Sequence, residues 1–256
     1  MLMGDLFRSF VVRHNLIKTG EPSRKIFIAA TPRSGSSLLA RSLEASALAG
    51  YACEFLNSIN VIYAEACKCP DFSVRKYLNL TSKSFQSLNG VFSIKGMYDS
   101  FIQYTDIFSS YDFIYIERKN KIEQGISVFK LSKNEAGNSK AAAKAILHSG
   151  DYSFDEISGH IYSSCYYNAL WKKYFRDKNI NPVNVVYEDF IQDISGTISQ
   201  VIKETLNVDF SPDDSIPPLI HKQADSLSEY YYNRYRYELK EKGHVLADIA
   251  FNELYR

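Results

Sequence analysis

Seven residues between an apolar run and a helical pattern carry the groups best suited to chemistry. They read Thr31-Pro32-Arg33-Ser34-Gly35-Ser36-Ser37. Successive backbone N–H groups in such a loop, with a helix N-terminus behind them, form an anion site. Gly35 allows close backbone approach, Arg33 adds a fixed charge, and hydroxyl donors come from Ser34, Ser36 and Ser37. The alternative interpretation is a serine-rich turn that only caps a helix.

The loop departs in two places from the G-x-x-x-x-G-K-[ST] motif of nucleoside triphosphatases. Ala30 stands at the first glycine position and Ser36 at the lysine position. Without the lysine, the loop is poorly suited to a β,γ-phosphate with magnesium. Arg33 ahead of Ser-Gly-Ser suits instead a donor whose 5′-phosphate is bonded to sulfate.

A second candidate anion site follows another apolar run. Arg118 comes directly after the run that ends at Glu117, and Ser127 lies on the helix expected after it. Residues at the carboxyl edge of a parallel sheet face the ligand crevice, and an arginine fork with a hydroxyl can hold an isolated phosphate. Without the first loop, the same pair would be read as a surface arginine and a helix serine.

Four short apolar runs predict the strands that position these groups. They are residues 25–30, 91–95, 112–117 and 183–187, and helical patterns follow at 38–49, 118–131, 154–177 and about 188–206. Strands that alternate with helices predict a parallel sheet with both faces covered. We therefore expect an α/β fold, a P-loop-like three-layer α/β/α arrangement with a helical insertion before the fourth strand. One domain over 1–256 is expected, with its core at about 25–210 and a helical tail at about 216–256.

The composition of the chain limits the classes of partner that it is expected to bind. The chain has 45% hydrophobic and 23% charged residues and a formal net charge of +1, which argues against binding nucleic acid or an anionic membrane in bulk. No apolar run is long enough to span a bilayer, and charged residues interrupt the first sixteen positions, so a signal peptide is not expected. Reduced thiols in a cytoplasmic protein are the better interpretation of the cysteines, which are Cys53, Cys67, Cys69 and Cys165. Neither these cysteines nor the five histidines show metal-ligand spacing, so no metal is expected.

Several segments together resemble the sulfotransferases. IFIAATPRSGSSLLARSL, the Glu54-Phe55 pair, IERKNKIEQGISVFK and VNVVYEDF occur in that family's order and rough spacing. The chain resembles in particular the bacterial trehalose 2-sulfotransferase family, which also has segments like 222–225 (KQAD) and 233–236 (NRYR). The likeness extends from about residue 25 to 236, with the loop and the Arg118/Ser127 pair as its specific parts.

The resemblance implies a donor and a set of roles. The donor would be 3′-phosphoadenosine 5′-phosphosulfate (PAPS), leaving 3′-phosphoadenosine 5′-phosphate (PAP) as product. Residues 33–37 would bind the 5′-phosphosulfate, Arg118 and Ser127 the 3′-phosphate, and Glu54 would be the catalytic carboxylate. It also implies a homodimer and a sugar or glycolipid hydroxyl as acceptor. The family's usual threonine is Ser37 here, and the surroundings of Glu54 and Lys95 differ more, which leaves the acceptor open.

The expected reaction is an in-line transfer without a metal. Glu54 would take the acceptor's proton, while Arg33, the loop N–H groups and Lys95 would meet the charge that develops. Lys95 follows the second run and is otherwise a solvated lysine at a strand end. Two rivals stay open: a small-molecule kinase, in which Glu117 would hold a metal, and a catalytically silent nucleotide- or glycan-binding module.

Overall fold

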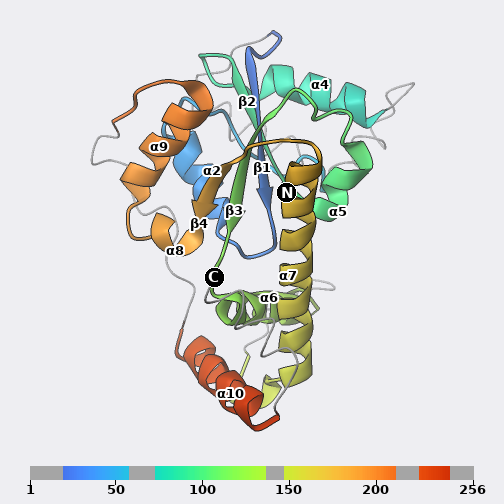
Figure 1. Ribbon diagram of the computed structural model, residues 1–256, viewed down its shortest axis with the longest axis vertical. Coiled ribbons are helices and arrows are strands. Elements are labelled where there is room, and N and C mark those ends of the chain that lie inside the picture. The colour runs from blue at the N-terminus through green and yellow to red at the C-terminus, as the bar shows by residue number, and fades with distance from the viewer. Residues whose placement is uncertain (1–19, 58–72, 137–146, 212–224, 243–256) are drawn as a thin grey trace.

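The computed structural model describes residues 20–57, 73–136, 147–211 and 225–242. Within those residues, four parallel strands form one sheet in the order β2-β1-β3-β4 (Figure 1). The strands are β1 (Arg24–Ala30), β2 (Val91–Met97), β3 (Asp112–Glu117) and β4 (Val183–Val186). The expected α/β class and parallel sheet are confirmed. Because β1 lies between β2 and β3, the loop after β1 adjoins the carboxyl ends of both neighbours.

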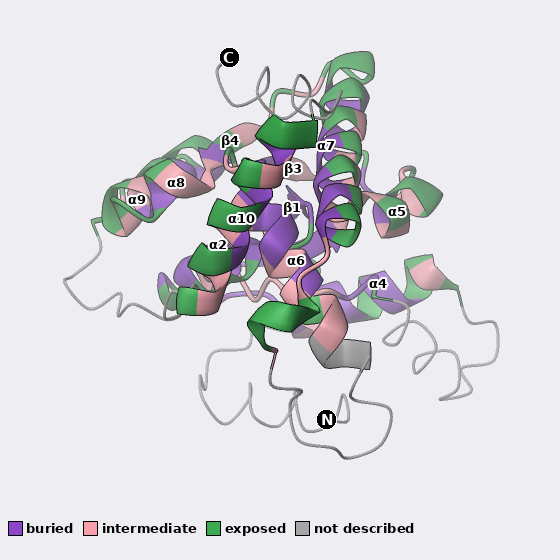
Figure 2. Ribbon diagram, turned by 90° about the horizontal axis from the view of Figure 1, so that it is seen from below, coloured by how far each residue is buried: buried purple, intermediate pink, exposed green. Residues whose placement is uncertain are grey.

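Each face of the sheet is covered by helices, which explains why the strands read as continuous apolar runs. Ile26, Ile28 and Ala30 face one apolar cluster with α2 (Ser36–Ala45) and α9 (Ile194–Leu206). Phe27 and Ala29 face the other, with α4 (Val74–Ser84), α5 (Tyr98–Phe101) and the end of α7 (Phe154–Asp177). The chain thus has three layers, and the buried residues concentrate around β1 (Figure 2).

A third apolar cluster lies beyond the carboxyl ends of the strands. It joins α6 (Lys121–Ala136), the start of α7 and α10 (Ser226–Lys242) through Ile126, Phe129, Ile157, Tyr231 and Tyr235, among others. Residues 154–177 form the long helix that the sequence predicts. The tail helix α10 packs on α6 and on the short helix η2 (Ser149–Asp151), so α6 separates it from the strand ends (Figure 1). The rest of the predicted tail, 216–224 and 243–256, lies outside the described residues, as do Cys67 and Cys69.

The segment after β4 forms two helices, where the sequence indicates only a helix that reaches about residue 206. The strand ends at Val186, and Tyr187 begins a single turn, α8 (Tyr187–Phe190). A new helix starts at Ile194 because Asp193 adopts non-helical angles and its Oδ1 accepts a 2.8 Å hydrogen bond from the N–H of Gly196. An N-cap of this kind ends one helical segment and starts another. The helix after β3 is also longer than expected and reaches Ala136.

None of the described helices is long and apolar enough to cross a membrane.

Candidate active site

The loop between β1 and α2 needs a glycine at position 35 for two separate reasons. Gly35 has φ of 95°, which disfavours any residue with a side chain, and Arg33 has φ of 60°. A Cβ at position 35 would also lie 2.2 Å from Cδ2 of Tyr187. The loop therefore turns sharply and packs tightly against the residue that follows β4.

The backbone of this loop presents donors, since several of its carbonyl groups already have partners. The Thr31 carbonyl accepts a 3.2 Å hydrogen bond from the N–H of Ser34, and the Gly35 carbonyl accepts from Leu38 and Leu39. Gly35 is the N-cap of α2 and provides no capping side chain, so the first N–H groups of that helix have no intrahelical acceptor. The Ser34 hydroxyl is fully buried and has no hydrogen-bond partner among the described residues. An anion at the loop would satisfy all of these donors.

Two arginines meet beside the loop, together with the predicted serine. Arg33 donates a 2.8 Å hydrogen bond from Nε to Oγ of Ser127 on α6. The Arg118 guanidinium lies 4.8 Å from the centre of the Tyr187 ring, and its Nε has no hydrogen-bond partner in the described part of the chain. Burial, and then the positive charge of Arg118, lower the pKa of Arg33. Arrangements that hold two cations together favour an anion between them.

The structure thus brings together residues that the sequence assigns to two subsites. Arg33 belongs to the predicted phosphosulfate loop, and Ser127 to the predicted 3′-phosphate pair, yet they are hydrogen-bonded. Arg118 also forms an ion pair with Glu123 and lies 4.0 Å from Glu188. The residues predicted for the two anion subsites therefore adjoin, and carboxylates already contact the arginine predicted for the second one.

Lys95 joins the predicted base to the loop. Its Nζ lies 2.9 Å from Oε1 of Glu54 and donates a 2.9 Å hydrogen bond to Oγ of Ser37. The residue is 6% exposed, so the alternative of a solvated strand-end lysine is wrong. Glu54 is brought to this position because the Lys95 N–H donates to the Cys53 carbonyl at 3.0 Å, which aligns the 53–54 backbone with β2.

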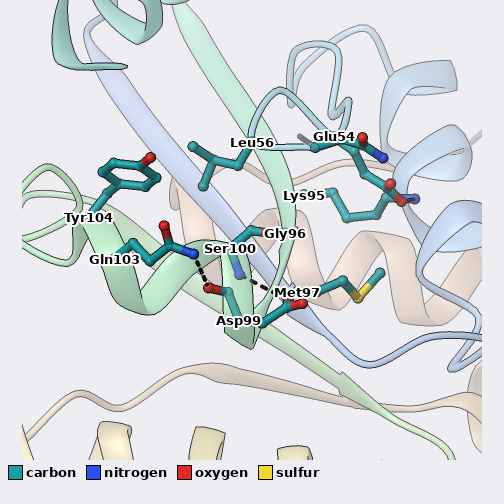
Figure 3. Close-up of a pocket in the computed structure, with 10 residues that line it drawn as sticks. Glu54, Leu56, Lys95, Gly96, Met97, Asp99, Ser100, Gln103 and Tyr104 are labelled. Carbon is teal, nitrogen blue, oxygen red and sulfur yellow. Dashed lines mark hydrogen bonds and ion pairs between the residues drawn. The ribbon is translucent and has the colours of Figure 1, made fainter. Parts of the chain in front are cut away.

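A pocket of about 490 Å³ opens on the far side of Glu54 and Lys95 (Figure 3). Its opposite wall is a short helical segment, α5 followed by η1 (Ile102–Tyr104). Asp99, Gln103 and Tyr104 on this wall line the pocket, and Asn57 and Met97 line it from other segments. Glu54 therefore lies between the loop and an open, mostly polar pocket.

Several of these residues were not singled out from the sequence. Tyr187 is the last residue of the fourth apolar run, a position that points to the carboxyl edge of the sheet. Glu123 follows Arg118 by five residues, and only the fold shows that the two side chains pair. No sequence pattern indicated the wall of the pocket, because its residues lie in two short helical turns without hydrophobic periodicity.

The residue that the kinase alternative requires is engaged elsewhere. Glu117 forms a 3.0 Å ion pair with Lys172 on α7, and the Tyr115 hydroxyl lies 3.4 Å from its carboxylate. Among the described residues, no group of three or more His, Cys, Asp or Glu side chains could hold a metal ion. The geometry therefore gives the kinase alternative no support.

A family model, the Stf0 sulphotransferases, matches residues 96–238, more than half of the chain. The chain belongs to the Stf0 sulphotransferase family. It is accordingly a PAPS-dependent sulfotransferase, as its sequence predicts. The matched region includes Arg118, Ser127 and Asp99 but begins one residue after Lys95, so the loop and Glu54 lie outside it.

Comparison with solved structures finds matches at low similarity, among them one sulfotransferase domain. The sulfotransferase domain of the Synechococcus PCC 7002 olefin synthase is 13% identical with a TM-score of 0.43, covering 84% of this chain and 88% of that domain. Retinol dehydratase in complex with androsterone and the inactive cofactor PAP is 15% identical with a TM-score of 0.32, covering 91% of this chain and 71% of that one. No curated protein matches the chain. At these scores, no residue role is transferred from either structure.

Proposed function

We propose that this Stf0 sulphotransferase moves the sulfuryl group of PAPS to a hydroxyl of a carbohydrate or glycolipid, with Glu54 as the general base. One observation carries the proposal. Glu54, Lys95 and Ser37 form a continuous series of 2.9 Å contacts that leads from the pocket to the anion-binding loop. A base on the acceptor side and a cation on the donor side are what an in-line transfer requires.

The residues of the loop fit the phosphosulfate end of the donor. The buried, unpartnered Ser34 hydroxyl and the first N–H groups of α2 offer hydrogen bonds to its oxygens. The absence of a side chain at Gly35 lets the loop pack against the Tyr187 ring. We assign residues 33–37 to the 5′-phosphosulfate, and Arg118 with Ser127 to the 3′-phosphate.

The reaction then runs as a single displacement. The acceptor oxygen attacks sulfur and its proton passes to the Glu54 carboxylate. The bond between sulfur and the bridging oxygen breaks, and PAP leaves with the electron pair. Lys95, Arg33 and the loop N–H groups stabilise the negative charge that grows on the leaving oxygens. No metal enters this scheme, and transfer should persist in the presence of a chelator.

The pocket supports a polyhydroxylated acceptor. Asp99, Gln103 and Asn57 present planar polar groups, and Tyr104 adds an aromatic ring. Carboxylates and amides bind pairs of hydroxyl groups, while the faces of sugar rings pack on aromatic rings. Because Lys95 pairs with Glu54, Asp99 leaves the pocket lining with one net negative charge, which disfavours an anionic acceptor. We therefore propose an uncharged sugar or the headgroup of a glycolipid; whether it is trehalose, the family example, is for experiment to decide.

The same proposal includes three expectations that follow from the sequence alone. The chain acts as one domain over 1–256, as a homodimer, and in the cytoplasm. Sedimentation of the purified chain tests the second of these.

Calorimetric titration with PAP tests the donor half of the proposal. We expect the wild type to bind PAP without added metal, and Arg33→Ala and Arg118→Ala each to weaken binding at least tenfold. Stabilisation by ATP with magnesium, together with no response to PAP, would instead support a kinase. Transfer of radiolabelled sulfate from PAPS to a panel of sugars and glycolipids tests the acceptor half. PAP binding without transfer to any panel member would favour a silent binding module.

A further inference from the structure

A buried polar cluster contacts the start of the donor loop. Gln124 on α6 is fully buried, and its Nε2 donates to Oγ1 of Thr31 at 2.9 Å and to the carbonyl of Pro32 at 2.7 Å. Asn168 on α7 is 2% exposed, and its Oδ1 lies 3.5 Å from Oγ1 of Thr31 and 3.0 Å from the Tyr115 hydroxyl. We call Gln124, Thr31 and Asn168 the loop anchor.

The carbonyl groups at the start of the loop are each held by a partner, and Gln124 of the loop anchor holds one of them. Nε1 of Trp171 donates to the Ala30 carbonyl at 3.0 Å, the Ser34 N–H binds the Thr31 carbonyl, and Gln124 binds the Pro32 carbonyl. Three successive carbonyl groups are thus held by partners inside the protein. A carbonyl oxygen that turned toward the anion site would repel the donor's sulfate and phosphate. Fixing these carbonyls keeps N–H groups directed at the donor.

The next residues show why such fixing is needed. Arg33 adopts a left-handed conformation that is strained for a residue with a side chain, and Gly35 adopts another two positions later. Strain of this kind persists only when the surroundings hold it in place. The loop anchor lies immediately before Arg33, and its amides come from helices outside the β1–α2 segment.

The hydrogen-bonding groups of the cluster are not all satisfied. Oε1 of Gln124 and Nδ2 of Asn168 are buried without a hydrogen-bond partner in the described part of the chain. Leaving such atoms unpaired costs about 1–3 kcal/mol each. The Oε1 of Gln86, away from the loop, is buried without a partner in the described residues as well, so what distinguishes Gln124 and Asn168 is their contact with the loop.

We infer that Gln124 and Asn168 are positioning residues for the donor loop, holding residues 30–32 so that residues 33–37 are preorganised for the sulfate and phosphate of PAPS. This inference rests on the proposed function. It extends the donor site to α6 and α7, and it assigns those helices a part in donor affinity in addition to their place in the third apolar cluster.

Gln86 provides a matched control for the experiment. It is also a buried glutamine, 1% exposed, and its Nε2 also donates twice to backbone carbonyls, those of Gly20 and Lys83. It lies at the amino end of the sheet, before β2 begins. Gln124→Met and Gln86→Met therefore remove the same groups and differ in their position relative to the loop.

Calorimetric titration with PAP, beside thermal unfolding of each variant, distinguishes positioning from packing. Both variants should lose thermal stability to a similar degree, but only Gln124→Met should weaken PAP binding, by tenfold or more. Equal PAP affinity in Gln124→Met, Gln86→Met and wild type would overturn the inference while leaving the proposed function intact. A wild type that does not bind PAP would overturn both.

A second pair of variants applies if Gln124→Met does not fold. Thr31→Val removes the shared hydroxyl with little change in shape, and Thr31→Ser retains it. We expect Thr31→Val to weaken PAP binding several-fold and Thr31→Ser to restore most of the affinity. Thr81→Val is the control, since Thr81 is a buried threonine on α4 whose hydroxyl donates to the Tyr77 carbonyl. Similar PAP affinity in Thr31→Val and Thr81→Val would contradict the inference.

Discussion

The Lys95 ammonium lies 2.9 Å from the Glu54 carboxylate, and this ion pair separates the pocket from the donor loop. Lys95 is buried, whereas the Glu54 side chain is 37% exposed. The carboxylate can therefore reach an acceptor while the ammonium stays with the loop.

Glu54→Gln should abolish most transfer while PAP binding stays within about twofold of wild type. The amide keeps the shape of the side chain but cannot take a proton, and general base catalysis typically contributes about 10²–10⁴-fold. The transfer rate is measured with saturating PAPS, and PAP affinity is measured by calorimetry. Glu204→Gln, on the outer surface of α9, is the control. A transfer rate for Glu54→Gln that matches this control would remove the base assignment.

Lys95→Met should lower kcat by about 10²-fold or more, with a smaller effect on PAP affinity. The ammonium meets charge that grows only as the sulfur–oxygen bond breaks, and such interactions lower kcat when they are removed. Lys25→Met, at a more exposed lysine over the Tyr111 ring, shows the effect of removing a lysine elsewhere on the sheet. A loss confined to KM would instead indicate that Lys95 only binds substrate.

Gly35→Ala should weaken PAP binding more than any change of similar size elsewhere in the loop. The new methyl group would meet the Tyr187 ring at 2.2 Å, and φ of 95° is strained for alanine. Gly20→Ala separates these two causes, because Gly20 also has positive φ, 130°, but has nothing within 4 Å of an added Cβ. We expect Gly20→Ala to bind PAP normally. Normal binding by Gly35→Ala would show that the loop can rearrange.

Glu123→Gln should tighten PAP binding by a few-fold and most strongly at low salt. Glu123 contacts Arg118, so it both occupies the guanidinium and repels the incoming 3′-phosphate. Titrations with PAP at two salt concentrations measure the change, with Glu156→Gln as the control since Glu156 pairs with Lys133 at the edge of α7. Weaker binding by Glu123→Gln would mean that the carboxylate mainly orients Arg118.

Gly125→Ala should destabilise the protein by about 1–3 kcal/mol, the usual cost of overpacking. The added Cβ would lie 2.5 Å from Cγ1 of Ile161 and 3.2 Å from the Ile157 carbonyl, where α6 crosses α7. Gly159→Ala, in α7 with nothing within 4 Å, should instead stabilise by about 1 kcal/mol through helix propensity. Urea unfolding of both variants checks the pair. Equal stability of the two variants would mean that the contact between α6 and α7 can accommodate the added methyl group.

The sequence was sufficient to predict the strands and the loop because both depend on neighbouring residues. An apolar run such as 25–30 and the turn that follows it are local patterns, and the structure confirms the run as β1. Arg118 and Ser127 were correctly expected near the carboxyl edge of the sheet. Their contact with Arg33 was not, because it depends on strand order: β3 pairs with β1 and so brings α6 beside the loop.

Other features were missed for the same physical reason. The loop anchor joins residues 93 and 137 positions apart, and amphipathic periodicity gives no information on such pairs. The break between α8 and α9 has a local signal at Asp193, an N-cap residue, which the apolar pattern on either side obscured. Lys95 could not be distinguished from a solvated lysine until the Glu54 turn was placed against β2.

The wall of the pocket has a consequence for the reactions that this fold can acquire. Asp99, Ser100, Gln103 and Tyr104 lie within one stretch of α5 and η1, and none of them contacts the loop after β1 in any described hydrogen bond or ion pair. Tyr98 and Phe101 in the same stretch pack on Trp171, whose Nε1 binds the Ala30 carbonyl, so these two residues must be kept. Exchanges confined to Asp99, Ser100, Gln103 and Tyr104 spare these contacts, and under the proposed function they are a practical route to new sulfation specificities.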